Sequence, residues 1–182
     1  QIIDKKKFLK QCKRFLERII AGDIFVYPTD TIYGIGCNAL NSKSVAKIRK
    51  IKNRDEKPFS VITPGKEWIR KNCLVNEKVG QWLTKLPGKY TLILELKNRN
   101  AVANNVNKAK NSLGIRIPEH WFSEIVKEAG VPFVTTSVNA SGQKSIESLK
   151  EINEHDETYL RPMYKKFFSR IRIFEARLSG FW

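Results

Sequence analysis

Apolar residues recur along the chain in two patterns, at helical spacing over longer stretches and in short continuous runs. Residues 4–21 carry one apolar stripe at helical spacing, which predicts a helix: Phe8, Cys12, Phe15 or Leu16, and Ile19. Gly22 follows where a glycine commonly ends a helix. The same spacing predicts helices at 67–71, 77–86 and 119–129. A further helix is expected to begin at a cap residue, Asn41 or Ser42, and to turn three residues toward the core: Val45, Ile48 and Ile51.

The short apolar runs are bounded by proline, glycine or polar residues, a pattern that predicts buried strands. They are Ile24–Tyr27, Phe59–Ile62, Tyr90–Leu96, Leu113–Pro118 and Phe133–Thr136. Because strands and helices interleave and hairpin turns are scarce, we expect the α/β class, with helices flanking a twisted mixed β-sheet. The length of 182 residues and the lack of a linker predict a single domain over residues 1–182.

Membrane, secretory and metal-bound classes find little support in the sequence. The apolar runs are far shorter than the ~18 residues of a membrane span, and the basic, amphipathic start of the chain is unlike a secretion signal. The three cysteines (Cys12, Cys37, Cys73) are widely spaced, which argues against a disulfide framework or a zinc site, and the two histidines are isolated. We therefore predict no structural metal and a cytoplasmic location.

The charge of the chain is strongly positive. Lys and Arg total 34 against 18 acidic residues, which gives a net charge of +16. A field of this size attracts polyanions such as RNA, nucleotides or an anionic membrane. A lysine-rich solvated surface is the alternative interpretation, and charge alone does not identify the anion.

Four polar segments lie at the ends of predicted strands or helices, and each has two interpretations. Asp30 between two threonines forms an ordinary polar turn or a ligand site. Lys52-Asn53-Arg54 either carries cations that the dipole favours at the C-terminal end of a helix, or forms a clamp that binds phosphate. Arg116 faces solvent or holds a carboxylate. The hydroxyl-rich run 135–142 caps a helix or offers donors to an anion or amino acid.

Taken together and in order, these segments resemble the YrdC-type threonylcarbamoyl-AMP synthase family over about residues 15–145. Five ordered motifs carry the resemblance: Tyr27-Pro28-Thr29-Asp30-Thr31-x-Tyr33-Gly34-x-Gly36, Lys52-x-Arg54 with Lys57-Pro58, Pro87-Gly88-x-Tyr90-Thr91-Leu92, Gly114-x-Arg116-x-Pro118-x-His120, and Thr136-Ser137-x-Asn139-x-Ser141-Gly142. The family's hallmark is a Lys-x-Arg followed by a Ser-x-Asn, and both are present.

The resemblance implies a YrdC-like fold and an enzyme, a nucleotidyltransferase. Members make threonylcarbamoyl-AMP and pyrophosphate from L-threonine, bicarbonate or CO2, and ATP with Mg²⁺. A partner transferase complex then modifies tRNA. By resemblance Lys52 and Arg54 are catalytic and bind ATP together with Asn139. The threonine-binding residues are Thr31, Arg116 and Ser137, and no metal ligand is implied.

The C-terminal part departs from the family pattern. The family continues to a Ser-Thr-x-x-Asp strand and a later Leu-Arg, which do not follow Leu178-Ser179-Gly180 here. We therefore expect residues 150–182 to be divergent or truncated, and full activity depends on how the site is closed. The aromatic and apolar residues there fit an amphipathic helix docked on the sheet: Tyr164, Phe167, Phe168, Ile171 and Phe174.

Two other functions compete with the synthase. The first is a non-catalytic module of the same fold that binds double-stranded RNA or tRNA, which the charge of +16 favours. The second is a carbamoyl-transfer relative of the domain in hydrogenase maturation proteins, which resides in much larger chains. Dependence of ATP turnover on threonine separates the synthase from both.

Overall fold

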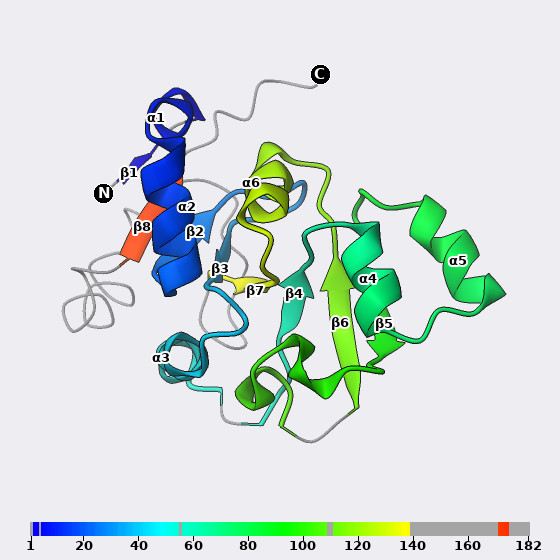
Figure 1. The fold of residues 1–182 in the computed structure, drawn as a ribbon. Coiled ribbons are helices and arrows are strands. Elements are labelled where there is room, and N and C mark those ends of the chain that lie inside the picture. The colour runs from blue at the N-terminus through cyan, green and yellow to red at the C-terminus, as the bar shows by residue number, and fades with distance from the viewer. Residues whose placement is uncertain (1, 4, 55, 109–110, 139–170, 175–182) are drawn as a thin grey trace.

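The computed structural model describes residues 2–3, 5–54, 56–108, 111–138 and 171–174. Strands and helices alternate along most of the chain (Figure 1). The strands are β1 (Ile2–Ile3), β2 (Ile24–Tyr27), β3 (Gly34–Gly36), β4 (Ser60–Ile62), β5 (Leu92–Glu95), β6 (Ser112–Arg116), β7 (Phe133–Ser137) and β8 (Ile171–Phe174). The helices are α1 (Lys5–Lys10), α2 (Cys12–Ala21), α3 (Ser42–Lys52), α4 (Lys66–Asn72), α5 (Glu77–Thr84) and α6 (Trp121–Ala129), with 3-10 turns η1 (Arg99–Ala101) and η2 (Asn104–Val106).

The strands form one mixed sheet of eight strands in the order β1-β8-β2-β3-β7-β4-β6-β5. The pairs β1–β8, β8–β2 and β4–β6 are parallel, and the other neighbours are antiparallel. Figure 1 shows α1 and α2 beside the β1–β8–β2 end, and α4 and α5 beside the β5 end. The predicted α/β class and mixed sheet are confirmed.

Alternating strand residues serve two hydrophobic clusters, one on each face of the sheet. Along β2, Ile24 and Val26 belong to a cluster with residues of α3, α4 and α5, whereas Phe25 and Tyr27 belong to one with residues of α2 and α6. In the second cluster the Tyr27 ring stacks on Phe122 with centroids 4.0 Å apart. The cluster under α2 and α6 reaches Ile62 on β4, the sixth of the eight strands in the sheet order.

Three predicted helix ends are confirmed by their capping geometry, whereas α5 ends at Thr84 and α6 begins at Trp121, two residues inside the predicted bounds. The Asn41 side chain accepts a hydrogen bond from the Ser44 N–H at the start of α3. Gly22 and Gly130 end α2 and α6 with φ of 91° and 68°, in the left-handed region that glycine adopts without strain.

Two of the three cysteines, Cys37 and Cys73, are buried free thiols. Burial raises the pKa of the Cys73 thiol to about 11 and also raises that of Cys37, so both thiols stay protonated at neutral pH.

The predicted helix over 4–21 was wrong in one respect, because two helices meet at Gln11. Gln11 leaves the helical region with φ of −126° and ψ of 26°. Seven residues of a continuous helix would separate Phe8 from Phe15 by roughly 10 Å. The break instead brings their rings to 5.7 Å between centroids. Aromatic packing therefore outweighs continuation of the helix.

The other differences concern strands. Gly34–Gly36 forms β3, which the sequence indicated only as part of a turn. The expected helix through Ile171 and Phe174 was also wrong, because residues 171–174 form β8 and pair in parallel with β2. Tyr164, Phe167 and Phe168 lie outside the described residues, and the single-domain extent of 1–182 stays a prediction. Within the described part of the chain, no helix is long and apolar enough to span a membrane.

Candidate active site

Small and polar residues lie on parts of β7, β4 and β6, on the face that α2 and α6 cover elsewhere, beside the large Phe133 and Ile62 of β7 and β4. Ser60 on β4 pairs with Thr135 on β7 and with Gly114 on β6. A Cβ atom at position 114 would lie 2.5 Å from the Ser60 hydroxyl, so a larger side chain does not fit there. Ser60 and Thr135 line a cavity of about 110 Å³ on this face of the sheet. Its other lining residues include Thr29, Gly34, Arg116 and Ser137.

Lys52, the last residue of α3, is one of the predicted site residues and is almost fully buried. It is 3% exposed, and its Nζ donates to the Ser137 carbonyl over 2.6 Å. Burial, and then the neighbouring Arg54 charge, lower the pKa of Lys52 to about 8. The amino group lies at the end of β7, and a nearby anion would stabilise its protonated form.

Arg54 follows Asn53, whose φ of 46° turns the chain away from α3. Its guanidinium donates to the Pro58 carbonyl over 2.7 Å and lies 3.4 Å from the Thr136 hydroxyl. Burial, and then Arg49, lower the pKa of Arg54. Its Nε is buried without a hydrogen-bond acceptor among the described residues. We call the side chains of Lys52 and Arg54 the Lys52–Arg54 clamp, since both contact the end of β7.

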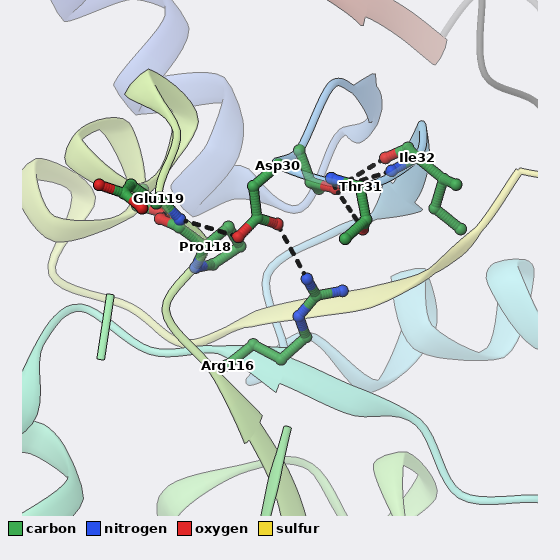
Figure 2. A network of polar contacts seen from close by, with 8 residues as sticks. Asp30, Thr31, Ile32, Arg116, Pro118 and Glu119 are labelled. Atoms are coloured by element: carbon green, nitrogen blue, oxygen red, sulfur yellow. Dashed lines mark hydrogen bonds and ion pairs between the residues drawn. The ribbon is translucent and has the colours of Figure 1, made fainter. Parts of the chain in front are cut away.

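Arg116, the last residue of β6, faces a carboxylate in the structure. Its Nη2 lies 3.0 Å from Asp30 Oδ1, and both side chains are largely buried. The other Asp30 oxygen accepts the backbone N–H of Glu119 over 3.2 Å, so that Asp30 bridges the two (Figure 2). Asp30 follows β2, four places from β6 in the strand order, so the loop between β2 and β3 lies across the sheet face. Arg116 Nε is buried without an acceptor in the described part of the chain.

The turn that carries Asp30 is held by the Thr29 hydroxyl. This hydroxyl donates to the Ile32 carbonyl over 2.8 Å and accepts the backbone N–H groups of Thr31 and Ile32, each over 3.2 Å. It also lies 3.1 Å from the Thr31 hydroxyl. Thr31 itself is exposed, and it stands between Thr29 and Ile32, which line the cavity.

The structure brings together most of the residues that the sequence singled out. Lys52, Arg54 and Ser137 meet at the end of β7, while Arg116 and Ser137 share the cavity lining. Asn139 lies outside the described residues. Sequence reasoning missed Asp30 as the partner of Arg116, although a carboxylate between two threonines was a signal for it. It also missed Ser60 and Arg49, which give no local signal.

The electrostatics of this region favour an anion. Two cations with lowered pKa values, Lys52 and Arg54, contact Ser137 and Thr136 at the end of β7, and these two residues line the cavity together with Arg116. Protonated groups that are buried beside like charges gain free energy when an anion arrives. Among the described residues, no group of three His, Cys, Asp or Glu side chains is arranged to hold a metal ion. The arrangement therefore fits a phosphate- and carboxylate-bearing ligand.

Comparison with known proteins gives family and fold. The model of the Sua5–YciO–YrdC family, described as "Telomere recombination", matches residues 17–163. A relative in Methanocaldococcus jannaschii, named a putative threonylcarbamoyl-AMP synthase, is 39% identical over 154 residues, which are 83% of this chain and 70% of the relative. The threonylcarbamoyl-AMP synthase of Bos taurus is 32% identical over 136 residues, 74% of this chain and 49% of that protein.

Among solved structures, P. abyssi Sua5 complexed with L-threonine superposes with a TM-score of 0.75 at 22% identity. The match covers 96% of this chain and 49% of that one, so the chain spans about half the length of both Sua5 and the bovine relative. This likeness confirms the YrdC-like fold. With the family model matched over most of its length, the chain belongs to the Sua5–YciO–YrdC family.

Proposed function

We propose that this chain is an L-threonylcarbamoyladenylate synthase. A threonine carbamate, formed from the amine and CO2 or bicarbonate, attacks the α-phosphorus of ATP through a carbamate oxygen. The bond between the α-phosphorus and the bridging oxygen breaks, and pyrophosphate leaves. The observation that carries the proposal is that three cations lie around one small polar cavity, in a chain whose relatives are named for this reaction. Arg116 lines the cavity, and the Lys52–Arg54 clamp contacts Ser137 and Thr136, which also line it.

The Lys52–Arg54 clamp is proposed to bind the ATP phosphates. Negative charge accumulates on pyrophosphate as it departs, and fixed cations stabilise that charge without reorganising during the reaction. Lys52 acts as a compact charge, whereas the Arg54 fork offers its spare Nε donor. Asn139 is proposed to contact the nucleotide. Little covalent chemistry is asked of the protein, so positioning is its main contribution.

Arg116 is proposed to bind the threonine carboxylate. Its guanidinium already pairs with a carboxylate, that of Asp30, and retains a buried Nε without an acceptor among the described residues. Thr31 and Ser137 are proposed to orient the amino acid. A site that pairs with the threonine hydroxyl would reject valine, because its own polar group would then be left unpaired.

Magnesium is proposed to arrive with ATP rather than on a resident protein site. Mg²⁺ keeps several waters and is commonly held through substrate phosphates, where it neutralises charge. The polar side chains that line the described cavity are hydroxyls and one cation, Arg116, a set that suits bound phosphate more than a bare metal ion.

Binding of ATP is expected to weaken above pH 8. Phosphate beside Lys52 stabilises its ammonium form, so the pKa of about 8 in the free protein rises in the complex. Affinity is therefore fully present below pH 8 and falls by up to about tenfold per pH unit as the free amine loses its proton. Titration calorimetry at pH 7, 8 and 9 measures this slope. Lys52→Gln should flatten it; a slope that persists in this variant contradicts the assignment.

Replacing Arg116 by lysine is expected to raise KM for threonine by roughly 10- to 100-fold. Lysine keeps the charge beside Asp30 but loses the planar fork that binds two carboxylate oxygens. The Kd for ATP should change less than about twofold, because the phosphates lie at the Lys52–Arg54 clamp. Initial rates over a threonine series, with ATP saturating, give KM. An unchanged KM removes Arg116 from the threonine site.

A second function, binding of tRNA or double-stranded RNA, is favoured by the net charge of +16. Phosphate contacts make such binding steeply dependent on salt, so affinity that does not fall with added salt argues against it. A downstream threonylcarbamoyl-transferase complex is proposed to take the product, and the cytoplasmic location stays a prediction.

The proposed synthase is tested by pyrophosphate release from ATP. We expect release that requires both threonine and bicarbonate, with little release when valine replaces threonine. Binding of RNA together with threonine-independent or absent release would favour the binding module instead.

A further inference from the structure

Arg49, on α3, is buried and makes an unusual set of contacts with backbone carbonyls. It is 6% exposed, although its side chain carries a full charge. Its Nε donates to the Asn105 carbonyl over 2.7 Å, and its Nη2 donates to the Val106 carbonyl over 3.2 Å. Its Nη1 donates to the carbonyls of Arg54 and Lys57 over 2.9 and 3.2 Å. One side chain thus binds two separate segments of backbone.

The two segments are the loop after α3, which carries Arg54, and the turn η2. The backbone between them is bonded as well, since the Phe59 N–H donates to the Val106 carbonyl over 3.0 Å. The Phe59 ring lies beneath both guanidiniums, 4.7 Å from that of Arg49 and 5.1 Å from that of Arg54. Arg49 therefore fixes the backbone of Arg54 through a hydrogen bond and shares the ring against which the Arg54 side chain packs.

Only an arginine supplies this arrangement. Four acceptors in different directions need the five donors and fixed plane of a guanidinium, whereas a lysine ammonium is a point with three donors. Burial of a cation is costly unless hydrogen bonds compensate it. Here the four hydrogen bonds to carbonyls compensate that cost, and they tie the buried charge to the backbone of Arg54, beside the candidate anion site.

We propose that Arg49 is a positioning residue that holds the Lys52–Arg54 clamp in its phosphate-binding arrangement. The inference rests on the proposed function and adds a residue to it. Arg49 acts through Arg54 rather than on the ligand. Two consequences follow: the backbone carbonyls of Arg54 and Lys57 are held in place before ATP arrives, and the Arg49 charge adds to the positive field at the clamp, where it lowers the pKa of Arg54.

The test uses Arg49→Lys, which keeps the charge and most of the stem but loses the fork. We expect the Kd for ATP to rise at least about tenfold, because small misplacements of a binding group are costly. The amide hydrogens of Arg54 and Phe59, which donate to the Arg49 and Val106 carbonyls, should exchange faster, while the Kd for threonine changes less than about twofold. Arg70→Lys is the matched control, since Arg70 is exposed and pairs with Glu67 within one helix. In this variant the Kd for ATP and the amide exchange should both stay unchanged.

Arg49→Lys is the deciding variant, because it keeps the charge and most of the side chain. Unchanged loop exchange together with an unchanged Kd for ATP in folded Arg49→Lys overturns the inference. Failure of the proposed function gives a different result: the wild-type chain binds ATP but releases no pyrophosphate with threonine. In that event the comparison of ATP binding and exchange still decides the role of Arg49.

Discussion

Replacing Arg54 by glutamine is expected to lower kcat/KM for threonine-dependent pyrophosphate release by about 10²- to 10³-fold, the range found when one preorganised donor to transition-state charge is removed. Glutamine keeps a polar side chain but loses the charge and the fork. Lys52→Gln should have a similar effect, since its amino group is the other cation of the clamp. Initial rates over ATP and threonine series measure both losses.

The matched control is Lys50→Gln, two residues before Lys52 on α3. Lys50 is exposed and basic, and it lies in the last turn of the same helix as Lys52. The control should keep kcat/KM within about twofold of the wild type, as expected for a solvated surface charge. Equal losses in Lys50→Gln and Arg54→Gln would mean that overall charge, and not the clamp, supports turnover.

Replacing Gly36 by alanine is expected to lower the free energy of unfolding by at least about 3 kcal/mol. A Cβ atom at this position would lie 1.8 Å from the Val134 carbonyl and 2.7 Å from the Phe133 ring. The carbonyl belongs to the backbone of β7, so the β3–β7 pairing must open to accommodate the methyl group. Urea unfolding followed by circular dichroism measures the change.

Gly80→Ala makes the same chemical change with the opposite expected sign. Gly80 lies inside α5, and a Cβ atom there would meet nothing within 4 Å. Alanine should therefore stabilise the protein by about 0.5–1 kcal/mol, the difference in helix propensity. If Gly36→Ala is as well tolerated as Gly80→Ala, the close approach of β3 to β7 is wrong.

Local patterns were sufficient to predict much of this fold. The runs at Ile24–Tyr27 and Phe59–Ile62 became buried strands, and Asn41 capped α3, because burial and capping depend on residues near in sequence. β3 was missed because its pattern, Gly34-Ile35-Gly36, carries one apolar side chain and two residues that disfavour strands. Its stability comes from pairing with β2 and β7 on either side, which no local pattern contains.

The candidate site was predictable in part for the same reason. Lys52 and Arg54 stand two residues apart, so their association is local. The Asp30–Arg116 pair joins residues 86 positions apart, and it depends on how the loop after β2 crosses the sheet. Arg49 likewise contacts carbonyls more than fifty positions away. Such contacts follow from topology, and a single sequence does not specify them.

Mass analysis of the nucleotide product shows directly whether the chain makes threonylcarbamoyl-AMP. The wild-type chain is incubated with ATP, ¹³C-bicarbonate and ¹⁵N-threonine, and the adenylates are separated at once. For the proposed synthase we expect an adenylate that carries both labels. It should form together with pyrophosphate and be lost in Arg54→Gln. ATP that stays intact, or an AMP product without either label, would contradict the proposed synthase.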